Sequence, residues 1–178
     1  VPDFDPGPLS WVRGEIAQAL ARGLDRLAAF RAAPSDLAAL RQARGHVHQV
    51  AGAIQMVGLD AVAVYIDEIE RQLQRLEELG PSDPDPACAC IDRACRKLVI
   101  FLDELVAGTP PVPLKLFPEY EAMQRERGIK VAAATDLFFP APRLRGQLPG
   151  APLPVPAENL AAHLLRQRRV YQSGLLAF

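Results

Sequence analysis

A repeat of apolar side chains between residues 59 and 76 constrains the fold more than any other part of the chain. Six residues alternate in steps of three and four: Leu59, Val62, Ile66, Ile69, Leu73 and Leu76. This spacing places them on one face of an α-helix and is typical of long helices that pack nearly antiparallel. The charged residues of the stretch are expected on the opposite, solvated face, where they would also be free to dock a partner: Asp67, Glu68, Glu70, Arg71, Arg75, Glu77 and Glu78.

Three further segments show helical periodicity, and their ends are marked by residues that stop or start helices. The first segment ends before Pro34, because proline disfavours helical geometry in the residue that precedes it. The second has Ser35 or Asp36 as its N-cap and ends at Gly58, because glycine accepts the left-handed conformation that follows a helix. Asp60 is expected to cap the third helix, which carries the repeat from Leu59 to Leu76.

The fourth segment follows a turn at residues 80–86 and ends near Ala107 and Gly108. Four amphipathic segments joined by short breaks predict an all-α fold, an up-down-up-down four-helix bundle. We assign residues 1–108 to this bundle. Its Leu, Ile and Val side chains are numerous enough to form a core without a metal or a disulfide.

Proline becomes frequent after Gly108, so residues 109–178 are expected to form a Pro-rich, partly helical extension. A short helix is expected over residues 119–127. The apolar segment Leu137-Phe138-Phe139 is expected to dock on the bundle or on a following module. Residues 140–156 resemble an extended polyproline linker. A last helix starts at residue 157 or 158. Because the chain begins with Val1 and this helix ends on apolar residues, we expect it to lead into the next module of a longer protein.

Composition excludes several classes of function. The net charge of −1 argues against a nucleic-acid-binding protein, and no apolar run is long enough to span a membrane. No Walker loop, dinucleotide fingerprint or zinc signature is present, so no cofactor or metal is predicted. Cys88, Cys90 and Cys95 lie on a helical segment and are interpreted as small buried residues in a reducing cytoplasm rather than as metal ligands.

The helix predicted to end at Gly58 carries a histidine beside its apolar stripe. The stripe runs in steps of three and four: Val47, Val50, Ile54 and Val57. His48 lies at the edge of this stripe and shares its side of the helix with residues one or two turns away: Arg41, Arg44, Ala51, Gly52 and Gln55. Such a histidine suits a phosphoryl group presented by a partner protein, because small neighbours leave room and a guanidinium offsets phosphate charge.

These residues resemble the motif of histidine phosphotransfer (Hpt) domains, His-x-x-Lys-Gly followed by a second glycine six residues later. His48, Gly52 and Gly58 stand at the matching positions, and Ala51 replaces the lysine. The likeness extends from residue 5 to residue 178 through blocks at 9–16, 48–59 and 136–140. These blocks look like the N-terminal module of hybrid histidine kinases that are related to chemotaxis kinases and control type IV pilus (twitching) motility.

The resemblance implies a phosphorelay role for the bundle. His48 would be the phosphoacceptor, with a kinase catalytic domain and a response-regulator receiver domain as partners. Arg44 would take the part of the missing lysine, and Gln55 would hydrogen-bond the ring or the phosphoryl group. Ala51, Gly52 and Gly58 would belong to the binding surface. The chain itself would be no enzyme, although its parent would be a hybrid sensor histidine kinase in the cytoplasm.

Two alternatives stay open at this point. Because Ala51 replaces the lysine, the chain could be a degenerate Hpt-like module that only docks partners. It could also be an interaction module that forms a homodimer through Leu137-Phe138-Phe139 and the last helix. His46 is interpreted as an ordinary surface histidine, and Trp11 and Tyr65 are predicted to pack in or at the border of the core.

Overall fold

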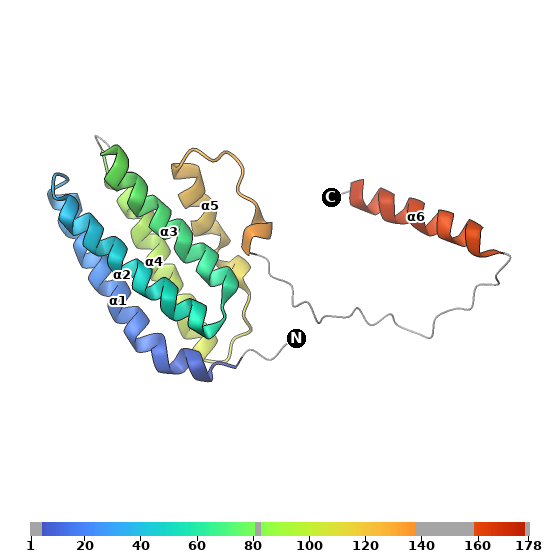
Figure 1. Cartoon of the computed structure of the whole chain (residues 1–178), viewed down its shortest axis with the longest axis horizontal. Coiled ribbons are helices and arrows are strands. Elements are labelled where there is room, and N and C mark those ends of the chain that lie inside the picture. Colours follow the sequence, from blue (N-terminus) through green and yellow to red (C-terminus); the bar gives the residue numbers. More distant parts are fainter. Residues whose placement is uncertain (1–4, 81–82, 138–158, 177–178) are drawn as a thin grey trace. The chain divides into compact units, whose positions relative to one another are not determined.

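The computed structural model describes residues 5–80, 83–137 and 159–176, and within these residues it contains helices and turns but no strand (Figure 1). The all-helical prediction is therefore confirmed. The four long helices of the first part of the chain are α1 (Gly7–Ala32), α2 (Leu37–Val57), α3 (Asp60–Leu79) and α4 (Asp85–Val106). They are followed by η1 (Pro113–Leu116), α5 (Phe117–Glu126), η2 (Ala134–Leu137) and α6 (Leu160–Leu176).

The four long helices lie side by side and share one core (Figure 1). Helix α1 packs against α2 and α4, and α3 packs against the same two helices. The predicted stripe of α3 is buried over its whole length, from Leu59 to Leu76. Tyr65 is fully buried as predicted, and its hydroxyl donates a 3.0 Å hydrogen bond to the carbonyl oxygen of Ala94 in α4.

The ends of α2 follow the sequence prediction, whereas the start of α3 does not. Asp36 is the N-cap of α2, and its Oδ1 accepts hydrogen bonds from the backbone N–H groups of Ala38 and Ala39 at 3.1 and 3.2 Å. Gly58 ends the helix with φ at +76°, in the left-handed region. Asp60 is not the cap of α3, because Leu59 holds that position. Asp60 is the first helical residue, where its negative charge is stabilised by the positive end of the helix dipole.

Trp11 lies on the surface, contrary to its predicted place in or beside the core. Its exposed fraction is 84%, the largest among the apolar side chains that are described as exposed. The physical reason is its position on α1, because the buried stripe through Leu9 and Ile16 turns Trp11 away from the other helices.

Residues after Gly108 pack against the long helices. Contacts divide the chain into two units, residues 1–141 and 142–178, of which we call the first the N-terminal unit. Helix α5, which matches the short helix predicted at 119–127, packs with η1 against α3 and α4. The apolar side chains that this segment buries hold it in place: Leu116, Tyr120, Met123 and Leu137. The predicted docking of Phe138 and Phe139 and the linker at 140–156 lie outside the described residues.

Helix α5 also changes the environment of the polar face of α3. Glu68 was expected to face solvent, but it is fully buried, and Gln72 is 1% exposed. Arg127, which follows α5, donates from Nη1 to both carboxylate oxygens of Glu68 at 2.7 and 2.9 Å, and Gln72 donates to the carbonyl oxygen of Met123. A residue far along the chain therefore supplies the charge that this carboxylate needs.

Helix α6 confirms that the last part of the chain is helical, although its predicted first residues lie outside the described ranges. Leu160, Leu164 and Leu165 are exposed within its own unit. Across the described helices, none combines the length and the apolar character that crossing a lipid bilayer requires.

Candidate functional site

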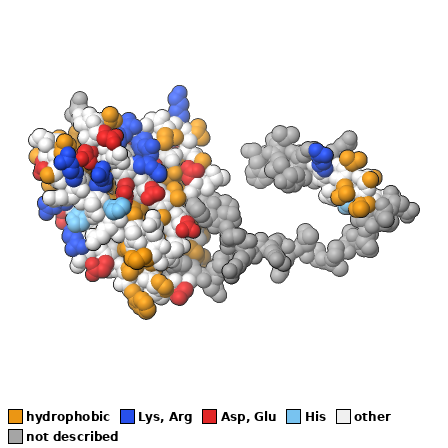
Figure 2. Space-filling view, viewed as in Figure 1, with side chains coloured by type: hydrophobic (Ala, Val, Ile, Leu, Met, Phe, Trp, Pro, Cys, Tyr) orange, Lys and Arg blue, Asp and Glu red, His pale blue; other side chains and the backbone are white. Residues whose placement is uncertain are grey.

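His48 stands on the edge of α2 that faces α3, with its side chain 80% exposed. Its neighbours Val47 and Val50 are buried, so the helix is fixed in rotation and the ring is directed outward. The Nδ1 atom of the ring lies 3.2 Å from Oε1 of Glu70 on α3. Figure 2 shows histidine next to charged side chains of both signs on the face of this unit that it presents.

The contact with Glu70 determines which ring nitrogen carries the hydrogen. A carboxylate can only accept a hydrogen bond, so Nδ1 of His48 is the donor and bears the proton. In the neutral ring, Nε2 then holds the lone pair. Within the described residues no group forms a hydrogen bond with Nε2. The result is an exposed nitrogen nucleophile in a defined tautomer.

Two arginines lie one and two turns before His48 and share one carboxylate of α3. Arg41 donates from Nε to Oε1 of Glu77 at 2.6 Å, and Arg44 donates from Nη1 to Oε2 at 3.2 Å. The hydrogen bond from Arg41, together with the charge of Arg44, lowers the pKa of Glu77 below its ordinary value. Both guanidinium groups keep further N–H donors for an incoming anion.

These side chains surround an open hollow of about 480 Å³ between α2 and α3. Its lining comes from two helices: Arg41, Arg44, Gly45 and His48 from α2, and Glu70 and Gln74 from α3. A phosphoryl group bound to His48 would stand beside this hollow, with cationic donors on one side and a carboxylate behind the ring.

Two glycines flank His48 in the interior of α2, Gly45 three residues before it and Gly52 four residues after it. A Cβ atom at either position would meet no heavy atom within 4 Å beyond the helix's own backbone. Glycine in a helix interior costs about 1 kcal/mol relative to alanine. Packing within this chain does not require either glycine, so the space beside His48 is available to another molecule.

The other residues predicted for the site do not line the hollow beside His48. Ala51, at the position of the family lysine, is only 5% exposed and belongs to the core instead of the surface around His48. Gln55 is exposed, but it does not line the hollow and forms no hydrogen bond with the ring among the described residues. Gly58 lies at the end of α2, where its role is to terminate the helix.

Sequence reasoning missed Glu70 and Glu77, which it placed on a general solvated face. A signal for them is present in the spacing. Arg41 and His48 are seven residues apart on α2, and Glu70 and Glu77 are seven residues apart on α3. Because the two helices are joined by a short turn and run antiparallel, the pairs meet in opposite order, Arg41 with Glu77 and His48 with Glu70.

The cysteines take no part in this site. Cys88, Cys90 and Cys95 are buried in α4 as predicted, and burial raises the pKa of the Cys88 thiol to about 11 and that of Cys95 to about 12. Among the described side chains, no three of the types His, Cys, Asp and Glu are grouped so as to hold a metal ion.

Comparison of the chain with protein-family models, with curated proteins and with solved structures found no match. The functional assignment therefore rests on the geometry around His48.

Proposed function

We propose that the N-terminal unit is a histidine phosphotransfer module, a four-helix bundle formed by α1 to α4, in which His48 carries a phosphoryl group between partner proteins. One observation carries the proposal above all others. His48 is 80% exposed, and a carboxylate from the neighbouring helix holds its Nδ1 atom, which leaves Nε2 as a nucleophile. The contacts of α1 with α2 and α4, and of α3 with the same helices, fit such a bundle.

The transfer step follows from this arrangement. The lone pair of Nε2 attacks the phosphorus atom of an aspartyl phosphate on a receiver domain. The bond between phosphorus and the aspartyl oxygen breaks, and the carboxylate leaves with the electron pair. No proton has to move, because Nδ1 already carries one. The positive charge that develops on the ring is stabilised by the Glu70 carboxylate, 3.2 Å away, in the way that a carboxylate stabilises a catalytic imidazolium.

Arg44 is our candidate for the group that offsets the charge of the bound phosphoryl group. It lies one turn before His48, lines the same hollow and uses only Nη1 in its 3.2 Å contact with Glu77. Its remaining donors allow it to bind an anion without releasing Glu77. Replacement by alanine should shorten the lifetime of phosphohistidine, whereas replacement of Arg41, two turns away, should shorten it less.

The proposal extends to the setting of this module. A kinase catalytic domain and a receiver domain are its proposed partners, and a chemosensory hybrid histidine kinase that controls motility, in the cytoplasm, is its proposed parent. The competing function is a docking module without phosphotransfer, favoured by the buried Ala51 at the position of the family lysine. The same experiment separates the two.

The experiment is phosphoryl transfer from a panel of receiver domains that have been labelled with radioactive acetyl phosphate. We expect label on the chain that is stable to base and labile to acid, as phosphohistidine is. His48→Gln should abolish this label. His46→Gln is the matched control, because His46 lies two residues away on the same helix and should not affect it.

Two results would contradict the proposal. Label that persists in His48→Gln would place the acceptor elsewhere. Absence of label from every receiver, with the fold intact, would favour the docking module.

A further inference from the structure

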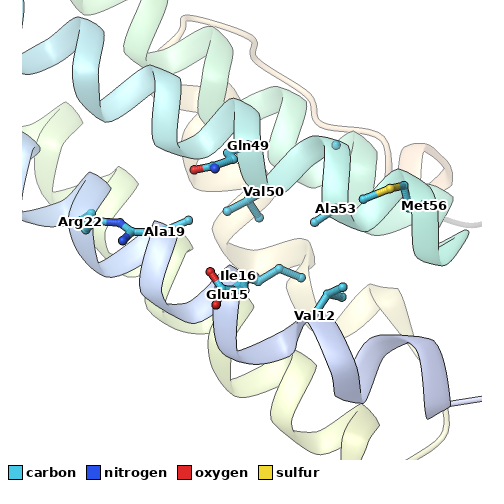
Figure 3. A pocket seen from close by; sticks show the side chains of 10 residues that line it. Val12, Glu15, Ile16, Ala19, Arg22, Gln49, Val50, Ala53 and Met56 are labelled. Atoms are coloured by element: carbon cyan, nitrogen blue, oxygen red, sulfur yellow. The ribbon is translucent and has the colours of Figure 1, made fainter.

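A second surface lies on the other edge of α2, between α2 and α1. It is a groove of about 450 Å³, whose walls are seen in Figure 3. Its lining is mostly apolar, with Val12, Ile16 and Ala19 from α1 facing Val50, Ala53 and Met56 from α2. Two large apolar residues of this region are strongly exposed: Met56, which lines the groove, is 80% exposed, and Trp11, the neighbour of Val12 in the chain, is 84% exposed.

The charged residues along this groove follow an ordered pattern. One face of α1 carries five exposed residues at steps of four, three, four and four: Trp11, Glu15, Gln18, Arg22 and Arg26; the exposed acid Asp25 lies at the edge of this face. Glu15 and Arg22 also line the groove, Arg22 at one end of it and Glu15 nearer its middle, beside Ile16. Read from the start of α1, the face presents an aromatic ring, an acid, an amide and two bases. The first half of this face is therefore acidic and the second half is basic.

This pattern is complementary to itself when reversed. If a second α1 lies antiparallel across the first, with its centre between Gln18 and Ala19, Glu15 stands level with Arg22 of the second copy. Trp11 then stands level with Arg26 of the second copy, an arrangement that favours a cation–π contact. A two-fold axis repeats each contact, so one face supplies two ion pairs and two aromatic contacts.

The backbone of α1 allows such an approach. On the flank of this face that is turned away from the groove lie Gly14, Ala17 and Ala21, which have small side chains or none. Helices approach closely where such residues meet, and the contact from Trp11 to Arg26 would extend over about 22 Å of helix. The exposed apolar atoms of Trp11 and Met56 would be removed from water in the same step.

We propose that the groove between α1 and α2 binds a second copy of this chain, through antiparallel contact of the two α1 helices. The surface differs from Leu137-Phe138-Phe139 and from α6. The hollow beside His48 lies on the α3 side of α2, whereas Gly52 lines the groove itself, so a second copy would compete with a receiver domain only at Gly52. Substitutions at Glu15 and Arg22 change neither His48 nor its hollow, so dimerisation and phosphotransfer can be tested separately.

The test uses the whole chain in a concentration series, followed by sedimentation velocity. Trp11 is the only tryptophan, so its fluorescence reports on this surface alone. We expect a monomer–dimer equilibrium, and we expect the emission maximum of Trp11 to move to shorter wavelength as the dimer forms.

Charge reversal tests the register. Glu15→Arg or Arg22→Glu alone turns both ion pairs into like-charge contacts and should weaken dimerisation about 100-fold. The double variant Glu15→Arg/Arg22→Glu restores opposite charges in both pairs and should restore the dimer. Glu126→Arg, an equal change on the exposed end of α5, should leave association unchanged. Circular dichroism confirms that each variant is folded.

Three outcomes would overturn the proposal. The first is a chain that stays monomeric at its highest soluble concentration. The second is a dimer that neither single reversal weakens or that the double variant does not recover. The third is a monomer whose Trp11 emission shifts only when a receiver domain is added, since the groove would then bind a different partner.

Discussion

At the scale of single residues, the reactivity of His48 depends on Glu70. A histidine on an exposed helix normally exchanges between two tautomers, and a carboxylate at Nδ1 favours the tautomer that is protonated there. The carboxylate would also stabilise the cationic ring that the proposed phosphorylation creates. Glu70 is only 24% exposed, so its contact with the ring at 3.2 Å is partly shielded from water.

Replacement of Glu70 by alanine should therefore slow phosphoryl transfer to His48 by about tenfold, which is the lower range for partners that orient a histidine. The measurement is the initial rate of label transfer from a receiver at saturating concentration. Glu121→Ala is the control, because Glu121 lies on α5, away from the hollow, and its carboxylate pairs with Arg125 at 3.0 Å. Equal rates for the two variants would show that Glu70 does not orient the ring.

At the scale of a helix, α2 contains two interior glycines that lower its stability. Gly52→Ala should raise the free energy of unfolding by up to about 1 kcal/mol, because alanine favours the helix and its Cβ meets no neighbour. The same change should slow transfer from a receiver, since the added methyl group occupies space beside His48. Urea denaturation and the transfer assay measure the two effects. A variant that is more stable and equally active would refute the assignment of this space to a partner.

The attachment of α5 gives a second prediction at this scale. Glu68 is fully buried, and Arg127 supplies its strongest contact, while Arg71 is 3.5 Å away. Arg127→Met should lower the free energy of unfolding by about 3 kcal/mol, because it leaves a buried carboxylate without that partner. The double variant Glu68→Leu/Arg127→Met should lower the free energy of unfolding by less, because it leaves no buried carboxylate without a partner.

Urea denaturation measures these changes. The matched control is Arg125→Met, which removes an exposed pair with Glu121 at 3.0 Å and should cost less than about 1 kcal/mol. A similar loss for Arg125→Met and Arg127→Met would mean that the buried pair does not hold α5 in place.

At the scale of the whole molecule, the buried thiols of α4 make stability depend on pH. Burial raises the pKa of Cys88 to about 11 and that of Cys95 to about 12, whereas an unfolded cysteine has a pKa near 8.5. The protonated form is favoured in the folded state. Its contribution is complete below about pH 8.5 and is lost as the pH rises, because unfolding then releases protons.

We therefore expect the free energy of unfolding to fall between pH 8.5 and pH 10 by roughly 1 kcal/mol per pH unit for each of these thiols. The urea midpoint at several pH values measures this fall. Replacing Cys88 and Cys95 by alanine should flatten the dependence even though it lowers stability at pH 7. An unchanged slope in the double variant would assign the effect to other groups.

The sequence predicted the helices well and their partners poorly, for one physical reason. Periodicity reports which face of a helix is apolar, so the burial of Ile66 or Leu73 followed from local spacing. It does not report what covers the polar face. Glu68 is buried because Arg127 and α5 return to it from 59 residues away, and Glu70 meets His48 only when α2 and α3 are paired. Trp11 was misplaced because the buried stripe of α1 turns it away from the other helices.

The central claim is that Nε2 of His48 carries the phosphoryl group. The most direct measurement is heteronuclear NMR of the chain, labelled with ¹⁵N at histidine and phosphorylated by a receiver, in which coupling between ³¹P and ¹⁵N identifies the bonded nitrogen. We expect one coupled nitrogen, the Nε2 atom of His48, with hydrogen retained on Nδ1. Coupling to Nδ1, or to a nitrogen of His46 or His163, would contradict it.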